Sequence, residues 1–164
     1  MKNYYWEMEE WFCCPKFNLD VLNEKEIIFN NEMFVKDKVI SFLHIPLNFW
    51  TVMTRNWKKI DEQEASPKDW LILSDENSLW WSDMYIKVTK NVKDCNNTTI
   101  SWKFITKVYE WPYKDMKKWI VDMQEYIKNK WKELEKLYFF YTTCPKCAKK
   151  RGKNYVVIFA KIKE

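Results

Sequence analysis

The chain has 164 residues, the usual length of one domain, and its 47% hydrophobic and 31% charged residues are ordinary for a globular protein. Its net charge of +5 is small, and the lysines alternate with acids, unlike the clustered basic face of a nucleic-acid binder. No apolar run approaches the roughly 20 residues of a membrane span, and residues 1–7 include Glu where a signal peptide is apolar. We therefore expect a cytoplasmic protein without a nucleic-acid or membrane partner, although the basic stretch 146–153 could meet a phosphate.

Glycine occurs once, at Gly152, and tryptophan eleven times, whereas average usage predicts about eleven glycines in such a chain. Turns need the positive-φ conformations that glycine supplies, so this composition is physically awkward. Abundant Lys, Asn and Ile are typical of an AT-rich gene, in which Trp should be rare. We hypothesise an alternative genetic code in which UGA means glycine; the alternative is a genuinely Trp-rich protein. The codons that test it are those of Trp50, Trp81, Trp102, Trp111 and Trp131.

The predicted elements begin after residues 1–35, which show no clear pattern and are expected to form an irregular wrapping segment. The apolar stretch 38–45 predicts a mostly buried strand, which Pro46 ends. A helix is predicted over 47–63, because its apolar residues recur at helical spacing. Two short strands follow, over 69–73 and 84–88.

The second half of the chain repeats this order. Alternation over 98–109 predicts a strand, and Pro112 fits the first turn of the helix that follows. That helix has the clearest amphipathic stripe in the sequence: Met116, Trp119, Ile120, Met123 and Ile127. Two closing strands, 137–142 and 155–162, are joined by a basic turn that contains cysteines.

Two β-α-β-β units in tandem produce this order of elements. Each unit alone leaves a sheet face uncovered, so we expect them to share one antiparallel sheet with two helices on one face. The other face is then open for a ligand. The sequence thus predicts a single α+β domain over 1–164, with its core in 36–164.

Residues 109–113, Tyr-Glu-Trp-Pro-Tyr, lie at the predicted junction between a strand and the helix with Trp119. This junction resembles the GyrI-like (gyrase-inhibitor-like) family, which includes the effector-binding domains of multidrug-sensing regulators. That family has a Gly-Pro-Tyr turn here, so Trp111 stands where the resemblance implies glycine.

Three longer stretches, 42–49, 73–76 and 138–150, are similar to bacterial and archaeal proteins labelled only as hydrolases. Together these resemblances imply a fold that binds small molecules. Some GyrI-like proteins hydrolyse strained electrophilic molecules with a Glu and a Tyr in the pocket, which implies catalytic roles for Glu110 and Tyr113.

The residue types at this junction support ligand binding. The carboxylate of Glu110 beside the ring of Tyr113 suits a cationic, amphipathic ligand, and a buried Glu could act as a general base. The alternative is a surface Glu and a Tyr that packs the turn. Four further aromatic residues could line the same concavity, each with core packing as its alternative: Trp80, Tyr85, Tyr138 and Tyr141.

His44, the one histidine, is another candidate for ligand contact. Its place at the end of an apolar strand also fits a packing or capping role. With no second histidine and no serine in an elbow sequence, a Ser-His-Asp triad is not supported.

The cysteines suggest a metal site. Cys144 and Cys147 form a CxxC pair, which resembles a zinc knuckle, but a structural zinc ion needs four ligands. Cys13 and Cys14 would complete the set if the N-terminal segment crosses the last hairpin. A redox dithiol and inert thiols are the alternatives, and a disulfide framework is unexpected in the cytosol.

The sequence therefore predicts a GyrI-like protein that binds a small amphipathic or electrophilic molecule and is a candidate hydrolase. One alternative is a module that sequesters or senses its ligand without chemistry. Another is a zinc-stabilised interaction protein that uses the 146–153 turn. The sequence does not indicate an oligomeric state.

Overall fold

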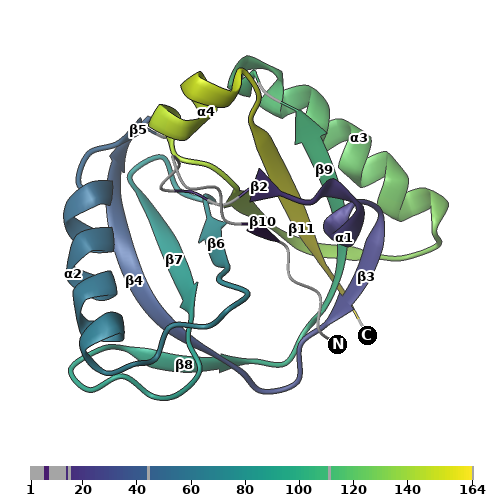
Figure 1. The fold of residues 1–164 in the computed structure, drawn as a ribbon. Helices are drawn as coiled ribbons and strands as arrows, with labels where there is room; N and C mark the ends of the chain where they lie inside the picture. Colours follow the sequence, from purple (N-terminus) through teal and green to yellow (C-terminus); the bar gives the residue numbers. More distant parts are fainter. Residues whose placement is uncertain (1–5, 8–13, 15, 44, 111, 164) are drawn as a thin grey trace. The chain divides into compact units, whose positions relative to one another are not determined.

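The computed structural model describes residues 6–7, 14, 16–43, 45–110 and 112–163 (Figure 1). The chain divides into two compact units. The central unit is Phe29–Ser101, and the terminal unit combines Met1–Ile28 with Trp102–Glu164. Each contains one β-α-β-β arrangement, so the predicted α+β class is confirmed.

The central unit is an antiparallel sheet with one helix. Its strands have the order β6-β7-β4-β5, and β8 also pairs with β4. The bounds are β4 Glu32–Phe42, β5 Ile45–Pro46, α2 Phe49–Glu62, β6 Ile72–Asp75, β7 Trp81–Lys87 and β8 Asn97–Ile100. On α2, the buried Met53 and Ile60 pack in one cluster with Val35 and Ile86 of the sheet. The buried Val52 packs with Val39 and Met84.

β4 is the longest strand and begins six residues before the predicted strand at 38. Its first residues pair with β8 and its middle with β7, so tertiary pairing sets its length. Polar residues interrupt the apolar pattern of this strand in the sequence, but they have partners in the structure. Lys36 forms an ion pair with Asp83 at 3.1 Å, and Asp37 accepts a hydrogen bond from Arg55 at 2.6 Å.

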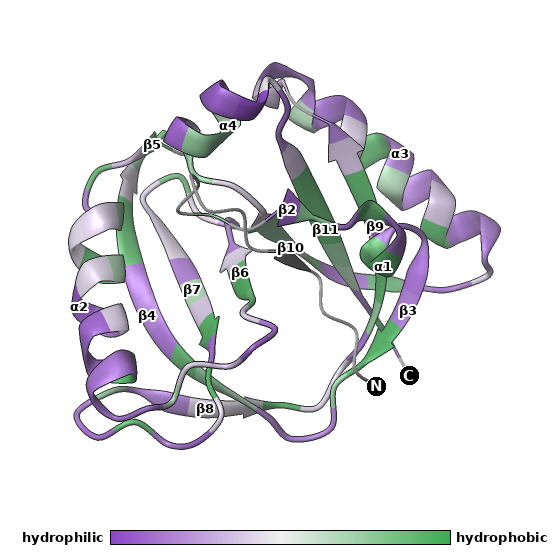
Figure 2. Ribbon diagram, in the orientation of Figure 1, coloured by the Kyte–Doolittle hydropathy of each residue, from purple (hydrophilic) through white to green (hydrophobic). Residues whose placement is uncertain are grey.

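The terminal unit contains antiparallel strands in the order β3-β9-β11-β10, and β1 and β2 form a separate pair. Its bounds are β1 Trp6–Glu7, β2 Lys16–Phe17, α1 Leu19–Leu22, β3 Lys25–Ile28, β9 Lys103–Glu110, η1 Tyr113–Asp115, α3 Met116–Asn129, β10 Leu134–Tyr141, α4 Pro145–Arg151 and β11 Tyr155–Ile162. Trp119, Met123 and Ile127 on α3 pack in one cluster with Ile105 and Ile158. In Figure 2, β11 is hydrophobic over most of its length, whereas α3 alternates along its turns.

Three sequence predictions are wrong. The 1–35 segment is not irregular throughout, because β2, α1, β3 and the start of β4 lie within it. Pairing with distant strands stabilises such short elements, since β3 pairs with β9. The basic cysteine turn is largely the helix α4, which starts with proline after Cys144 and ends at the left-handed Gly152. The predicted strand 98–109 is two strands, since β8 pairs with β4 and β9 with β11.

Helices α2 and α3 end in the same way. Glu64 and Trp131 adopt left-handed backbones with φ of 50° and 57°. At the end of α2, the N–H of Ala65 donates to the Ile60 carbonyl and that of Glu64 to the Asp61 carbonyl, which is a Schellman motif. At the end of α3, the N–H of Lys132 donates to the Ile127 carbonyl and that of Trp131 to the Lys128 carbonyl in the same motif. The Trp131 side chain is 96% exposed, so no packing compensates for a conformation that favours glycine.

The other tryptophans named by the genetic-code hypothesis give no such signal. Trp50 lies in α2, Trp81 in β7 and Trp102 just before β9, and Trp131 alone of the described tryptophans has a positive φ. Trp111 lies outside the described residues. The alternative genetic code therefore stays a hypothesis, with backbone support at one position.

Candidate functional site

The β9–η1 junction carries the two residues predicted to be catalytic. Glu110 is the last residue of β9, pairs in register with Tyr155 of β11, and is exposed. Tyr113 opens η1, is half-buried, and its ring centroid lies 6.5 Å from that of Tyr141 on β10. The junction thus places a carboxylate near the end of a strand and a tilted pair of phenol rings beyond it.

The anchoring of β9 to α3 next to this junction was missed at the sequence level. The Tyr109 hydroxyl donates to Asp122 at 2.7 Å, and the Lys107 ammonium lies 2.7 Å from the same carboxylate. The Tyr109 ring also stacks on Trp119, with centroids 5.7 Å apart. Burial, followed by the bond to Asp122, raises the pKa of Tyr109 well above its usual range.

This contact matters for the site because Tyr109 directly precedes Glu110. Lys107 and Tyr109 point to the helix, and the bond from Lys107 is the main cause of the lowered pKa of Asp122. The alternation of residues 107 and 109 was visible in the sequence, but the matching acid on the helix was not singled out. The end of β9 is therefore held in a fixed direction.

Tyr138 is mainly a packing residue in the terminal unit. It is 3% exposed, its ring stacks on Trp102 with centroids 5.6 Å apart, and it meets Phe104 edge-on. The Lys161 ammonium covers the Trp102 ring at 4.5 Å. These contacts favour core packing, the alternative role expected for Tyr138. Tyr141 differs, since it is half-buried beside Tyr113.

The other predicted ligand contacts lie in the central unit. Trp80 is 53% exposed, with its ring 5.9 Å from that of Phe42. Tyr85 is 9% exposed, and the Lys36 ammonium lies 5.3 Å from its ring centroid. His44 falls outside the described residues. That these side chains line one concavity with Glu110 stays a prediction.

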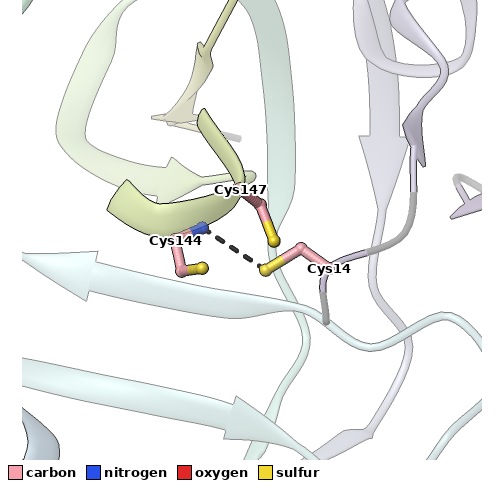
Figure 3. Close-up of side chains that lie close together, drawn as sticks. All are labelled: Cys14, Cys144 and Cys147. Carbon is pink, nitrogen blue, oxygen red and sulfur yellow. Dashed lines mark hydrogen bonds between the residues drawn. The ribbon is translucent and has the colours of Figure 1, made fainter. Parts of the chain in front are cut away.

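Three cysteines from distant parts of the chain meet at the start of α4. The sulfur atoms of Cys14, Cys144 and Cys147 all lie within 4.8 Å of one another (Figure 3). The backbone N–H of Cys144 donates to the Cys14 sulfur at 3.4 Å. Cys13, the fourth predicted ligand, lies outside the described residues. The three thiols could hold a metal ion, as predicted from the CxxC pair and its N-terminal partner.

Cys14 and Cys147 are buried, with 8% and 1% of their surface exposed, while Cys144 is half-buried. Burial raises the pKa of the Cys14 thiol to about 12 in the absence of a cation. A neutral thiol of this kind is a poor nucleophile, and a bound metal ion would deprotonate it.

Within the parts of the chain that the structure describes, no helix is long and apolar enough to cross a membrane.

Solved structures of known proteins share this fold. The chain superposes on the C-terminal domain of EcmrR with a TM-score of 0.60 at 8% identity, covering 85% of this chain and 95% of that one. A hydrolase from Listeria innocua gives 0.61 at 7% identity, covering 87% and 92%. SAV2435 bound to tetraphenylphosphonium gives 0.50 at 17% identity, covering 85% and 93%.

A search of curated proteins gives no match. The family model described as "Bacterial hydrolase" matches residues 4–162, nearly the whole chain. The resemblance noted from residues 42–49, 73–76 and 138–150 is thereby confirmed. The chain belongs to this bacterial hydrolase family.

Proposed function

We propose that this protein binds a small amphipathic molecule and hydrolyses electrophilic members of that class. The observation that carries the proposal is the family membership of the chain together with a fold shared with the EcmrR C-terminal domain and with a tetraphenylphosphonium-bound protein. Cys14, Cys95, Cys144 and Cys147 form no disulfide with one another, which agrees with a cytoplasmic setting.

The contact residues in this proposal are Glu110 and Tyr113. The Glu110 carboxylate supplies a negative charge at the end of β9, and the Tyr113 and Tyr141 rings supply aromatic faces nearby. Charge pairing and cation–π contact then favour the same kind of ligand, a bulky organic cation.

Hydrolysis uses the same groups on a strained ring such as an epoxide. Glu110 takes a proton from a water molecule, whose oxygen bonds to the ring carbon as the carbon–oxygen bond breaks. The Tyr113 hydroxyl donates its proton to the departing oxygen. The proton on Glu110 then passes through solvent to the Tyr113 phenolate, which restores both groups. One water is added, and the electron pair of the broken bond stays on the leaving oxygen.

Binding is tested with tetraphenylphosphonium and cationic dyes by calorimetry. We expect Glu110→Gln to weaken binding about tenfold or more, since one lost charge contact is worth about 1.4 kcal/mol or more. Glu125→Gln, on the exposed side of α3, is the matched control and should bind as the wild type does. Equal affinity in Glu110→Gln would remove Glu110 from the site.

Hydrolysis is tested by mass spectrometry of epoxide- and cyclopropane-type compounds incubated with the protein. Turnover that Glu110→Gln abolishes would support the enzyme. Binding without turnover would leave the second candidate, a sequestering or sensing module. The third candidate, an interaction protein that uses the 146–153 segment, predicts neither binding nor turnover and a captured protein partner.

A further inference from the structure

The cysteine cluster joins segments that are 130 residues apart in the chain. Cys14 comes from the N-terminal segment, whereas Cys144 and Cys147 come from α4 and the residue before it. Each of the three buried or half-buried thiols is a soft metal ligand. Their meeting from two distant segments therefore suggests a metal site.

We propose that Cys14, Cys144 and Cys147 bind one zinc ion as a structural clasp between the N-terminal segment and α4, with a water molecule as the fourth ligand. This site goes beyond the ligand-binding function and does not depend on it. Zinc bound to thiolates has zinc–sulfur distances of about 2.3 Å, which places neighbouring sulfurs about 3.8 Å apart. The sulfurs already lie within 4.8 Å of one another, so a small inward movement closes the site.

The surroundings favour a bound thiolate cluster. Three thiolates and one Zn²⁺ leave a net charge of −1. Lys146 lies within the CxxC stretch, and Lys149, Lys150 and Arg151 follow it in α4. Positive charges on the same short helix favour a negative cluster at its start. The Cys144 N–H bond to the Cys14 sulfur at 3.4 Å holds one ligand in place.

A disulfide fits the cluster less well. Three thiols cannot all pair, so any disulfide leaves one buried thiol over, whereas one metal ion uses all three. Among the described residues, no His, Asp or Glu joins this group, so thiolates define its chemistry. Soft thiolate ligands of this kind select zinc over magnesium or calcium.

Other contacts already hold the N-terminal segment near the cysteine cluster. The Arg151 guanidinium donates to the Cys14 carbonyl at 2.7 Å, and the Phe17 ring meets Phe140 edge-on at 6.3 Å. The segment is therefore held to α4 at the Cys14 backbone and to β10 at Phe17. A metal bond across this long loop should add stability, because loop closure is costly in the unfolded chain.

The test is the zinc content of the full chain, purified without a histidine tag under reducing conditions and measured by elemental analysis. We expect about one zinc per chain. Cys14→Ser and Cys147→Ser should each lower the content to below about a tenth after dialysis against a mild chelator. Cys95→Ser is the matched control and should keep the wild-type content, since Cys95 lies in the central unit.

A second measurement does not depend on the folding of any variant. Wild-type protein loaded with Co²⁺ should show thiolate charge-transfer absorption in the near ultraviolet, and zinc removal should lower Tm by at least about 5 °C. Less than about a tenth of an equivalent of zinc after reconstitution, or no thiolate band with Co²⁺, would overturn the proposal. So would a disulfide between two of these cysteines in protein alkylated directly on lysis.

Discussion

Helices α2 and α3 are both 14 residues long and occupy the same place in their β-α-β-β units, yet different chemistry holds them. On α2, the buried Asn56 amide donates to Asp37 of β4 at 2.6 Å and to the Val52 carbonyl at 2.8 Å. On α3, the buried positions are apolar, and the polar tie from Tyr109 to Asp122 lies at the exposed rim.

The difference explains why two similar units show no repeat in the sequence. A helix can be attached to a sheet by an apolar stripe alone, or by a stripe interrupted by one satisfied polar group. The two solutions need different residues at corresponding positions. The two units therefore share the order of their helices and strands but not the residues buried between helix and sheet.

Met123→Ala should have the largest effect on stability. Met123 is 0% exposed within the apolar cluster of α3, and truncation leaves a cavity that costs about 2–5 kcal/mol. Chemical denaturation followed by circular dichroism measures the change. Val121→Ala on the exposed side of α3 is the control and should cost under about 0.5 kcal/mol. Similar losses in both variants would mean that this stripe does not hold the helix.

Asn56→Ala should rank second, at about 1–3 kcal/mol, because it leaves the part-buried Asp37 carboxylate without one of its donors. The Arg55 bond to Asp37 at 2.6 Å remains and limits the loss. The exposed Asn91→Ala is the matched control. An unchanged denaturation midpoint in Asn56→Ala would show that α2, like α3, is held without a contribution from a buried polar group.

Asp37 should also give the central unit a pH dependence. Burial alone would raise its pKa, but the bonds from Asn56, Arg55 and the Lys38 N–H outweigh it and lower the pKa from the usual 3.8. Because the folded pKa lies below the unfolded one, this stabilisation is complete above about pH 4 and is lost as the pH falls further. The difference in unfolding free energy between wild type and Asp37→Asn should therefore shrink in acid. A difference that stays constant down to pH 2 would contradict this expectation. Asn91→Ala alters no titratable group, so its difference from the wild type should stay constant with pH.

The sequence predicted the two long helices α2 and α3 well, but it missed the short helices α1 and α4 and the polar ties. The stripe on α3 and the strands β10 and β11 follow from periodicity, because an apolar face must meet a core. β3 and the first residues of β4 could not be predicted this way, since their pairing with β9 and β8 depends on tertiary contacts.

The candidate sites divide in the same way. Cys14, Cys144 and Cys147 were grouped from ligand spacing, and the structure brings them together. Glu110 and Tyr113 came from a resemblance, which names positions but carries no geometry of its own. Asp37, Asn56 and Asp122 were missed, because a single sequence offers no signal that links an acid to a partner on another element.

The two helix ends provide the smallest predicted effect. Glu64 shows that a non-glycine residue is tolerated in the left-handed position after α2, so the backbone at Trp131 does not by itself establish a misread codon. Both residues should nevertheless gain about 0.5–1 kcal/mol on replacement by glycine, because the left-handed strain exceeds the added freedom of the unfolded chain. Trp131→Ala keeps the strain and should gain nothing. If Trp131→Gly is no more stable than Trp131→Ala, the structural support for glycine at 131 disappears, and only the codons at the five tryptophans can sustain the hypothesis.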